Sequence, residues 1–436
     1  MAQATMFFPA DFLWGTASAS YQVEGNNQNS DWWAWEQQAG RIWEGHRSGR
    51  ACDWWENAEA DLDRAADLGT NAHRLSLEWS RIEPEPSVFD EGAIDRYRQI
   101  LQAMHERGIE PMVTLHHFSN PLWLVEKGDF DSELVVDYFR RYVAKVADKL
   151  GDLIPKWITF NEPMVYLVMR YLDRVFPAPL RPGIWAMRQA AYHLLACHAA
   201  AYQTIKEKHP QALVGVAKNM IAIDPRPEGN PLDLWWAKQL SWLFNDWWME
   251  AMVDGRLRWP LGRGRINHLA GSFDFTGINY YTRFYVRFLR YYQRDWGPNA
   301  VVSDTNYGEV YPAGIYRVIK HALRYNKPIY ITENGLPDKN DALRPAFLLT
   351  HLREVWRAIS FNFPVMGYYH WTLVDNFEWD RGWLQRFGLY ALDPESQERK
   401  IRASGRLYGD ICHSRSISSD MAEKYAPQLL HKLFPG

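Results

Sequence analysis

Two glutamates, each following a short apolar run, are the residues in this chain best suited to acid–base or nucleophilic chemistry. Glu162 lies in TFNEP at 159–163 and Glu333 lies in YITENG at 330–335. Cleavage of a glycosidic bond requires two opposed carboxyls, one giving a proton while the other stays charged. Because the two glutamates stand far apart in the sequence, only a closed, repetitive fold would bring them to one place.

The segments that must position these carboxyls are short runs rich in β-branched and aromatic residues, which is typical of buried strands. Eight such runs occur, at 12–17, 72–79, 110–117, 156–162, 213–219, 273–281, 328–335 and 365–373. Between most of them lie segments of helical periodicity, including 91–108, which ends at a plausible glycine cap, 132–151, 186–208 and 313–325.

Strands that alternate with helices in this way predict a parallel sheet covered by helices, and eight units close into a (β/α)8 TIM barrel of the α/β class. No linker or low-complexity tract divides the sequence, so we expect one catalytic domain over residues 1–436. Chemistry in this fold lies at the carboxyl ends of the strands. Polar and aromatic residues gather at those ends: Arg74, Glu78, His116, His117, Asn161, Asn279, Tyr281, Asn334 and Trp371.

Composition argues against several classes of partner. A formal charge of −3 and a pI near 6.5 show no basic field for nucleic acid. The chain has no run of about 20 apolar residues and no secretory leader pattern at its start, so we expect a soluble protein with no membrane partner. Three cysteines without metal-ligand spacing indicate neither a disulfide framework nor a zinc site, and favour a cytoplasmic location.

A family resemblance rests on eight strings in order: FPADFLWGTASASYQVEG (8–25), HRLSLEWSRIEP (73–84), TLHHFSNPLWL (114–124), TFNEP, GINYYTR (277–283), ITENG, WTLVDNFEW (371–379) and RFGLYALD (386–393). Through these strings the chain resembles glycoside hydrolase family 1, the family of β-glucosidases and β-galactosidases. The resemblance implies that Glu162 is the acid/base and Glu333 the nucleophile, with Arg74 beside the nucleophile. Physical reasoning from the residues alone supports the pair but leaves the division of roles open.

The resemblance also implies a set of sugar-binding residues. Glu378 would accept bonds from sugar hydroxyls and repel a phosphorylated sugar, which points to an unphosphorylated glycone. Glu162, where the thioglycoside-cleaving branch has glutamine, points to O-glycosides. The implied substrate-binding residues are Gln22, His117, Asn161, Asn279, Tyr281, Trp371, Glu378 and Trp379.

Departures from the family pattern leave the preferred sugar open. Phe118 stands where the family commonly has tryptophan, and Ser119 and Asn120 replace the usual next residues. The stretch after Glu333 is short for the family, although Asp341, Arg344 and His351 keep its spacing.

Three features have alternative interpretations. His116 and His117 could form a metal pair, but neighbouring strand residues point to opposite faces, so we expect no metal or cofactor and a structural role for His116. Arg74 could instead pair with Glu78 in a structural ion pair. The segment 232–249 predicts a helix with a core-facing stripe, from which Trp242 and Trp248 deviate and are free to line a cleft or a subunit contact.

The expected activity is that of a retaining exo-β-glycosidase, a β-glucosidase-type O-glycoside hydrolase. It would release terminal non-reducing glucosyl residues, with galactosyl or fucosyl also possible, from small β-glycosides or short oligosaccharides. A transglycosidase using an alcohol or sugar acceptor is the alternative, and a non-catalytic sugar-binding barrel a remote one. The oligomeric state is left open.

Overall fold

Eight parallel strands close into a barrel. A computed structural model describes residues 4–179, 181–297 and 299–435, so the extreme ends of the predicted domain, 1–3 and 436, lie outside the described residues. The closed strand order is β10-β13-β14-β2-β3-β4-β5-β6. The barrel strands are β2 (Leu13–Ala17), β3 (Ala72–Ser76), β4 (Glu110–His116), β5 (Lys156–Asn161), β6 (Leu213–Asn219), β10 (Phe275–Asn279), β13 (Ile329–Asn334) and β14 (Val365–Trp371).

Each of the eight predicted runs contains one of these strands, so the predicted TIM barrel is confirmed. The strands are shorter than the runs, chiefly at their carboxyl ends. The run 72–79 ends its ladder at Ser76, because Trp79 begins the short helix α4 (Trp79–Ile82). The run 273–281 likewise ends at Asn279. Of the residues beyond these two strand ends, Tyr281 reaches the site described below.

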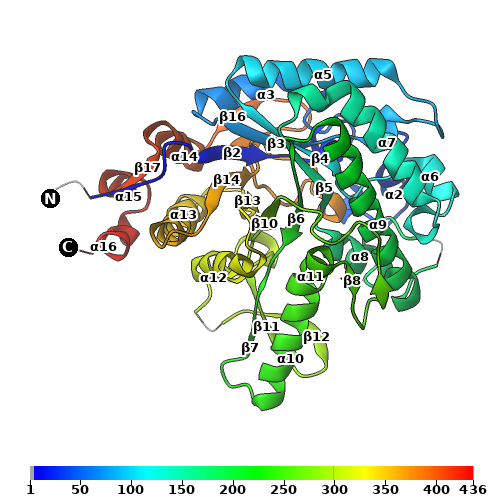
Figure 1. Ribbon diagram of the computed structural model, residues 1–436. Coiled ribbons are helices and arrows are strands. Elements are labelled where there is room, and N and C mark those ends of the chain that lie inside the picture. Colours follow the sequence, from blue (N-terminus) through cyan, green and yellow to red (C-terminus); the bar gives the residue numbers. More distant parts are fainter. Residues whose placement is uncertain (1–3, 180, 298, 436) are drawn as a thin grey trace.

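Helices surround the barrel, as Figure 1 shows. The predicted helix 91–108 is observed as α5 (Glu91–Glu106), with the Asp90 side chain accepting a bond from the Ala93 amide at its start. Gly108 follows its end with a φ of 67°, a left-handed conformation that glycine adopts without steric cost. The other principal helices are α3 (Trp54–Asp67), α7 (Val135–Leu150), α8 (Pro163–Tyr171), α9 (Ile184–Lys208), α12 (Pro312–Ala322), α13 (Arg344–Ser360) and α14 (Ala403–Ser414).

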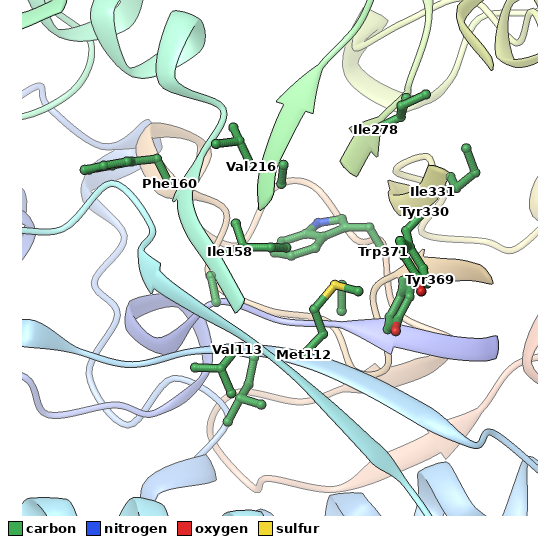
Figure 2. Packing of buried hydrophobic residues seen from close by; sticks show 14 of the residues in the cluster. Met112, Val113, Ile158, Phe160, Val216, Ile278, Tyr330, Ile331, Tyr369 and Trp371 are labelled. Carbon is green, nitrogen blue, oxygen red and sulfur yellow. The ribbon is translucent and has the colours of Figure 1, made fainter. Parts of the chain in front are cut away.

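The interior of the barrel is filled by side chains from facing strands. Figure 2 shows Met112, Ile158 and Trp371 pointing toward one another. Met112 and Ile158 are fully buried, and Trp371 is only 3% exposed. Because this packed core closes the barrel from below, any open space for a ligand lies at the carboxyl ends of the strands.

A small sheet and a long helical segment project from the barrel at the lower edge of Figure 1. The sheet has the order β12-β11-β7, formed by β7 (Ala222–Pro225), β11 (Arg283–Arg287) and β12 (Arg290–Asp295). Beside it lie α10 (Pro231–Ser241), a π-helical turn η4 (Trp242–Asp246) and α11 (Trp247–Asp254). At the other side, β1 (Thr5–Phe7) pairs with β17 (Ser416–Ser418), which brings the two ends of the chain together.

The predicted core stripe of 232–249 is wrong in its first half. Leu232 and Trp235 are 55% and 50% exposed, because α10 packs mainly on the small sheet and not on the barrel. Trp248, predicted to lie in a cleft or contact, is instead fully buried. The π-helical turn explains the change, since its extra residue rotates the face of the second helix relative to the first.

Trp242 lies in this turn, half-buried, with its indole N–H donating to Glu250 at 3.2 Å. It does not line either of the cavities described below. Across the described part of the chain, no helix combines the length and apolarity needed to cross a membrane.

Candidate active site

A cavity of about 700 Å³ opens at the carboxyl ends of the barrel strands. Both glutamates singled out by the sequence line it, and Glu162 and Glu333 reach it from β5 and β13. The other predicted residues that line it are His117, Asn161, Tyr281, Trp371, Glu378 and Trp379. Arg74, Asn279 and Gln22 do not line the cavity but hydrogen-bond to residues that do.

Glu162 lies at the turn between β5 and α8, where its φ of 41° places it in the left-handed region. Pro163 occupies the first helical position, which its fixed φ suits. The Oε1 atom of Glu162 accepts bonds from Asn279 Nδ2 at 2.8 Å and Asn219 Nδ2 at 3.1 Å. Within the described ranges Oε2 makes no hydrogen bond, so the proton of a neutral Glu162 belongs on Oε2.

Glu333 has a different environment, because both of its oxygens are held by donors. Its Oε1 forms an ion pair with Arg74, which reaches across the barrel from β3. Its Oε2 accepts a bond from the Tyr281 hydroxyl at 2.6 Å. A guanidinium and a phenol on the same carboxyl stabilise its negative charge and fix its orientation.

Arg74 also connects the two carboxyls. Its Nη2 donates to Asn161 Oδ1 at 2.7 Å, and Asn279 Nδ2 donates to the same oxygen at 3.1 Å. A continuous chain of hydrogen bonds therefore joins Glu333 to Glu162. It passes through Arg74, Asn161 and Asn279. The alternative ion pair between Arg74 and Glu78 is not formed, and Glu78 instead accepts bonds from the hydroxyls of Ser20, Ser80 and Ser119.

The same bonds assign the tautomer of His117. Because Asn161 Oδ1 accepts two donors, its Nδ2 faces His117 and donates to Nε2 at 2.9 Å. Burial, aided by the charge of Arg74, lowers the pKa of His117 well below its usual value, so the ring is neutral with its proton on Nδ1. Nδ1 is buried and has no partner among the described residues. It is therefore a donor without an acceptor among the described residues.

Glu378 is held by two amides at the opposite wall. Its Oε2 accepts from Gln22 Nε2 and Asn376 Nδ2, each at 3.0 Å. Burial raises the pKa of Glu378, and the two amide bonds oppose that rise. Gln22 is itself fully buried, with Nε2 also donating to the Phe377 carbonyl at 2.9 Å, so its Oε1 is the atom left without a partner among the described residues.

Aromatic rings form the remaining wall. The His117 ring lies parallel to Trp371 and Trp379, with centroids 6.1 and 5.9 Å away. Phe118, where the family pattern has tryptophan, packs edge-on against Trp379 at 5.4 Å and lines the cavity. A phenyl ring provides apolar contact there without the N–H donor of an indole.

The two glutamates differ in their electrostatic environment. Burial, together with the nearby negative charge of Glu333, raises the pKa of Glu162 to about 7. The bonds from Asn279 and Asn219 and the positive charge of Lys218 oppose this rise. Glu162 therefore has a pKa near neutrality, whereas Glu333 is paired with Arg74. Two carboxyls in such different environments are suited to act as a proton donor and its charged partner.

Three residues of this network were missed by the sequence reasoning. Asn219 ends β6, and the rule that selected polar residues at strand ends would have found it. Lys218 is fully buried, with Nζ donating to the Asn219 carbonyl at 2.6 Å, and nothing in its sequence context marks it as such. Asn376 lies inside the string WTLVDNFEW, which gives no separate signal for an amide aimed at Glu378.

His116 makes a structural contact, as predicted. Its Nε2 bonds with Asn120 Oδ1 at 3.0 Å, and its ring packs against Phe130, Phe160 and Tyr166. A search of the described residues finds no group of three or more potential ligands that could hold a metal ion.

A second cavity, of about 260 Å³, adjoins the first. Glu162 lines both, whereas Glu333, Trp371 and Glu378 line only the first. The residues shared by the two cavities are Glu162, Val165, Met169, Asp173, Asn219, Tyr281 and Tyr307.

Two carboxyls at strand ends of a closed barrel, in a cavity lined by aromatic rings and amides, define the class of barrel hydrolases that act on carbohydrates. The model of Glycosyl hydrolase family 1 matches residues 4–417. The chain is 30% identical to the β-galactosidase of Pyrococcus woesei over 96% of its length and 99% of that protein. It is also 30% identical to β-glucosidase A of Thermotoga maritima, over 94% and 98%.

Similarity to solved structures supports the same family assignment. The β-glycosidase from Pyrococcus horikoshii superposes with a TM-score of 0.87 at 38% identity, covering 97% of this chain and 98% of that one. The β-glucosidase from Thermotoga maritima in complex with noeuromycin gives 0.88 at 29% identity, covering 94% and 99%. The chain therefore belongs to glycosyl hydrolase family 1 and is an O-glycoside hydrolase.

Proposed function

We propose that this protein is a retaining exo-β-glycosidase that releases single non-reducing sugars from unphosphorylated β-glycosides. The contrast between the two carboxyls carries the proposal. Glu333 is paired with Arg74 and accepts a bond from Tyr281, whereas Glu162 has a pKa of about 7 and one oxygen free of hydrogen bonds among the described residues. A nucleophile needs the first environment and a proton donor needs the second.

In the first step Glu333 attacks the anomeric carbon while the Glu162 proton passes to the departing oxygen, which leaves an α-linked glycosyl ester on Glu333. Formation of the ester removes the negative charge of Glu333. The pKa of Glu162 then falls, because one of the two causes of its rise is gone, although the effect of burial remains. Glu162 thereby becomes a base that deprotonates the incoming water, and the sugar is released with its β configuration retained.

The exo mode is supported by the packed core beneath the cavity and by the groups around it. Trp371 closes the floor, while the Nδ1–H of His117, the amide of Asn161 and the carboxyl of Glu378 present donors and acceptors suited to hydroxyls of one sugar. Glucosyl is the sugar we favour, with galactosyl or fucosyl as further candidates, since these sugars are distinguished by few hydroxyls.

A panel of nitrophenyl glycosides tests this proposal. We expect release of nitrophenol from the β-D-glucoside, and weaker or comparable release from the β-D-galactoside and β-D-fucoside. α-Glycosides and 6-phosphoglucosides are the matched controls and should give none. Failure of every β-glycoside between pH 4 and pH 9 would favour a non-catalytic sugar-binding barrel.

Transfer to an alcohol acceptor is the second candidate activity. The apolar cavity beside Glu162 favours it, because an alcohol seated there could compete with water for the glycosyl ester. Product analysis with added alcohol separates the two activities. A glycoside of that alcohol as the main product would indicate a transglycosidase.

The pH dependence of the reaction should follow Glu162. Since Glu162 must be protonated in the first step and its pKa is about 7, kcat/KM should fall as the pH rises above about 7. Burial lowers the pKa of Lys218 itself to about 7, so Lys218 lowers the pKa of Glu162 by its positive charge only while its ammonium group stays protonated. In Lys218→Met we therefore expect the alkaline limb of the kcat/KM profile to move to higher pH.

Lys208→Met is the control, because Lys208 pairs with Asp148 at the end of α9, outside both cavities. Its profile should match the unmodified protein. An alkaline limb that stays in place or moves to lower pH in Lys218→Met would contradict the coupling.

Glu378 should control the choice between free and phosphorylated sugars. Burial raises the pKa of Glu378 to about 8, so its carboxyl is mainly charged above that pH, where this comparison is made. Glu378→Gln keeps the size of the side chain but removes that charge and alters its bonds with Gln22 and Asn376. We expect kcat/KM for nitrophenyl β-glucoside to fall about 10- to 100-fold, the effect of losing hydrogen bonds to a charged group. KM for the 6-phosphoglucoside should fall relative to that for the glucoside, and an unchanged ratio would contradict the role of the charge.

Three further expectations accompany the proposal. The cysteines Cys52, Cys197 and Cys412 are all free and buried, which supports a cytoplasmic location. We propose that the reaction needs no cofactor, since both carboxyls that it requires come from the chain. The assignment of residues 1–436 to a single domain stays a prediction.

A further inference from the structure

The cavity that adjoins the catalytic one has an unusual lining for a sugar-processing protein. Of its lining residues only Glu162 and Asp173 are charged, and the others are mainly aliphatic and aromatic. Most of them come from α8, the first turn of α9, the junction of α10 with η4, and β11, and others from the ends of β6 and β7 and from two loops. Leu240, Leu243 and Val286 are examples that line this cavity alone.

Glu162 stands at the boundary between the two cavities. Glu333, Trp371 and Glu378, which we propose hold the sugar, lie on the polar side only. The oxygen protonated by Glu162 joins the sugar to the leaving group. A glycoside bound with its sugar in the polar cavity therefore directs its leaving group into the apolar cavity.

The chemistry of the second cavity selects the leaving group. A second sugar would bring hydroxyls into a largely aliphatic lining, where hydroxyls without partners cost free energy. A linear hydrocarbon chain has no such cost and gains from leaving water. We propose that the preferred substrates are β-glycosides of linear apolar alcohols, alkyl or isoprenoid, rather than oligosaccharides. This inference rests on the proposed glycosidase activity.

The cavity reaches the surface at an apolar rim, which suits chains longer than the cavity. Leu172 and Ile184 line it and are also exposed. Beside this rim Trp185 is 74% exposed and Trp259 is 61% exposed. The Arg188 guanidinium lies over both indoles, at 4.8 and 5.2 Å, so the two rings lie close together.

Chain length is the variable that tests the inference. With methyl, butyl, hexyl and octyl β-glucosides, kcat/KM should rise by up to about fourfold per methylene until the cavity is filled, and then level off. Geranyl β-glucoside distinguishes isoprenoid from alkyl chains. Cellobiose, the glucoside of a second sugar, should be a poorer substrate than the octyl glucoside.

Two variants test whether the effect of chain length arises in the apolar cavity. Leu243→Gln and Ile184→Gln place an amide in the apolar cavity at positions that are already partly or largely exposed, which favours normal folding. Both should lower kcat/KM for octyl β-glucoside about tenfold or more, and by a clearly larger factor than for methyl β-glucoside, whose leaving group is too short to reach these side chains. Leu234→Gln is the matched control, because Leu234 is exposed on α10 and lines neither cavity.

The outcomes separate this inference from the proposed function. If nitrophenyl β-glucoside is cleaved but kcat/KM is independent of chain length, or cellobiose is preferred to the octyl glucoside, the apolar substrate class is wrong and the glycosidase remains. An equal loss on the methyl and octyl glucosides in Leu243→Gln would also overturn it. If no β-glycoside is cleaved at all, the proposed function and this inference both fail.

Discussion

Replacement of Glu333 by alanine should reduce kcat for nitrophenyl β-glucoside by about 10⁴-fold or more, because the group that forms the covalent bond is lost. Steady-state kinetics measure this loss. The variant leaves Arg74 without its carboxylate, so circular dichroism should accompany the assay. Glu395→Ala, which removes an exposed carboxyl, is the control and should retain full activity.

Added azide makes this prediction specific to the role of Glu333. In Glu333→Ala a small anion can occupy the space of the missing carboxylate and attack an activated β-glycoside from the same face. The product should therefore be the α-glycosyl azide, and turnover should rise with azide concentration. Recovery of the β-azide instead would reverse our assignment of the two glutamates.

Glu162→Ala should have the second largest effect, and one that depends on the leaving group. For glycosides with poor leaving groups, such as alkyl glucosides, kcat/KM should fall by about 10²- to 10⁴-fold, the range that general acid catalysis contributes. For dinitrophenyl β-glucoside the first step needs little proton donation, so kcat/KM should change far less. The glycosyl ester should then accumulate, which lowers KM.

Added azide also shows which step of the reaction is slowed in Glu162→Ala. In Glu162→Ala it should react with the ester on Glu333 and give the β-azide, with kcat restored for the dinitrophenyl substrate. A loss that is equal for good and poor leaving groups would show that Glu162 has a structural role only.

The sequence was sufficient to predict the barrel, because buried parallel strands are continuous apolar runs and each of the eight runs contains one strand. Glu162 and Glu333 could be paired from sequence for the same reason, since a closed barrel brings the ends of β5 and β13 to one cavity. The ends of the strands were predicted less accurately: the run 273–281 continues past Asn279, where the strand ends. There Tyr281 lies beyond the end of the strand, and its hydroxyl donates to Glu333.

Other features depend on packing that no local pattern reports. Lys218 lies in the predicted strand 213–219, but no local pattern indicates that its ammonium group is buried, with the Phe244 ring centroid 4.5 Å away. The predicted stripe of 232–249 requires a regular α-helical period throughout, and the π-helical turn at Trp242–Asp246 interrupts that period. The apolar cavity is built from segments that lie far apart in the sequence, between Glu162 and Tyr307, so only the folded chain reveals it.

The measurement that tests the central claim most directly is mass spectrometry of the protein after reaction with an activated 2-deoxy-2-fluoro-β-glucoside, whose ester intermediate is hydrolysed slowly. The account predicts one equivalent of released leaving group and one fluoroglucosyl group, located on Glu333 in the peptide digest. A label on Glu162 or any other residue, or turnover of substrate to the inverted α-anomer with no ester formed, would contradict it.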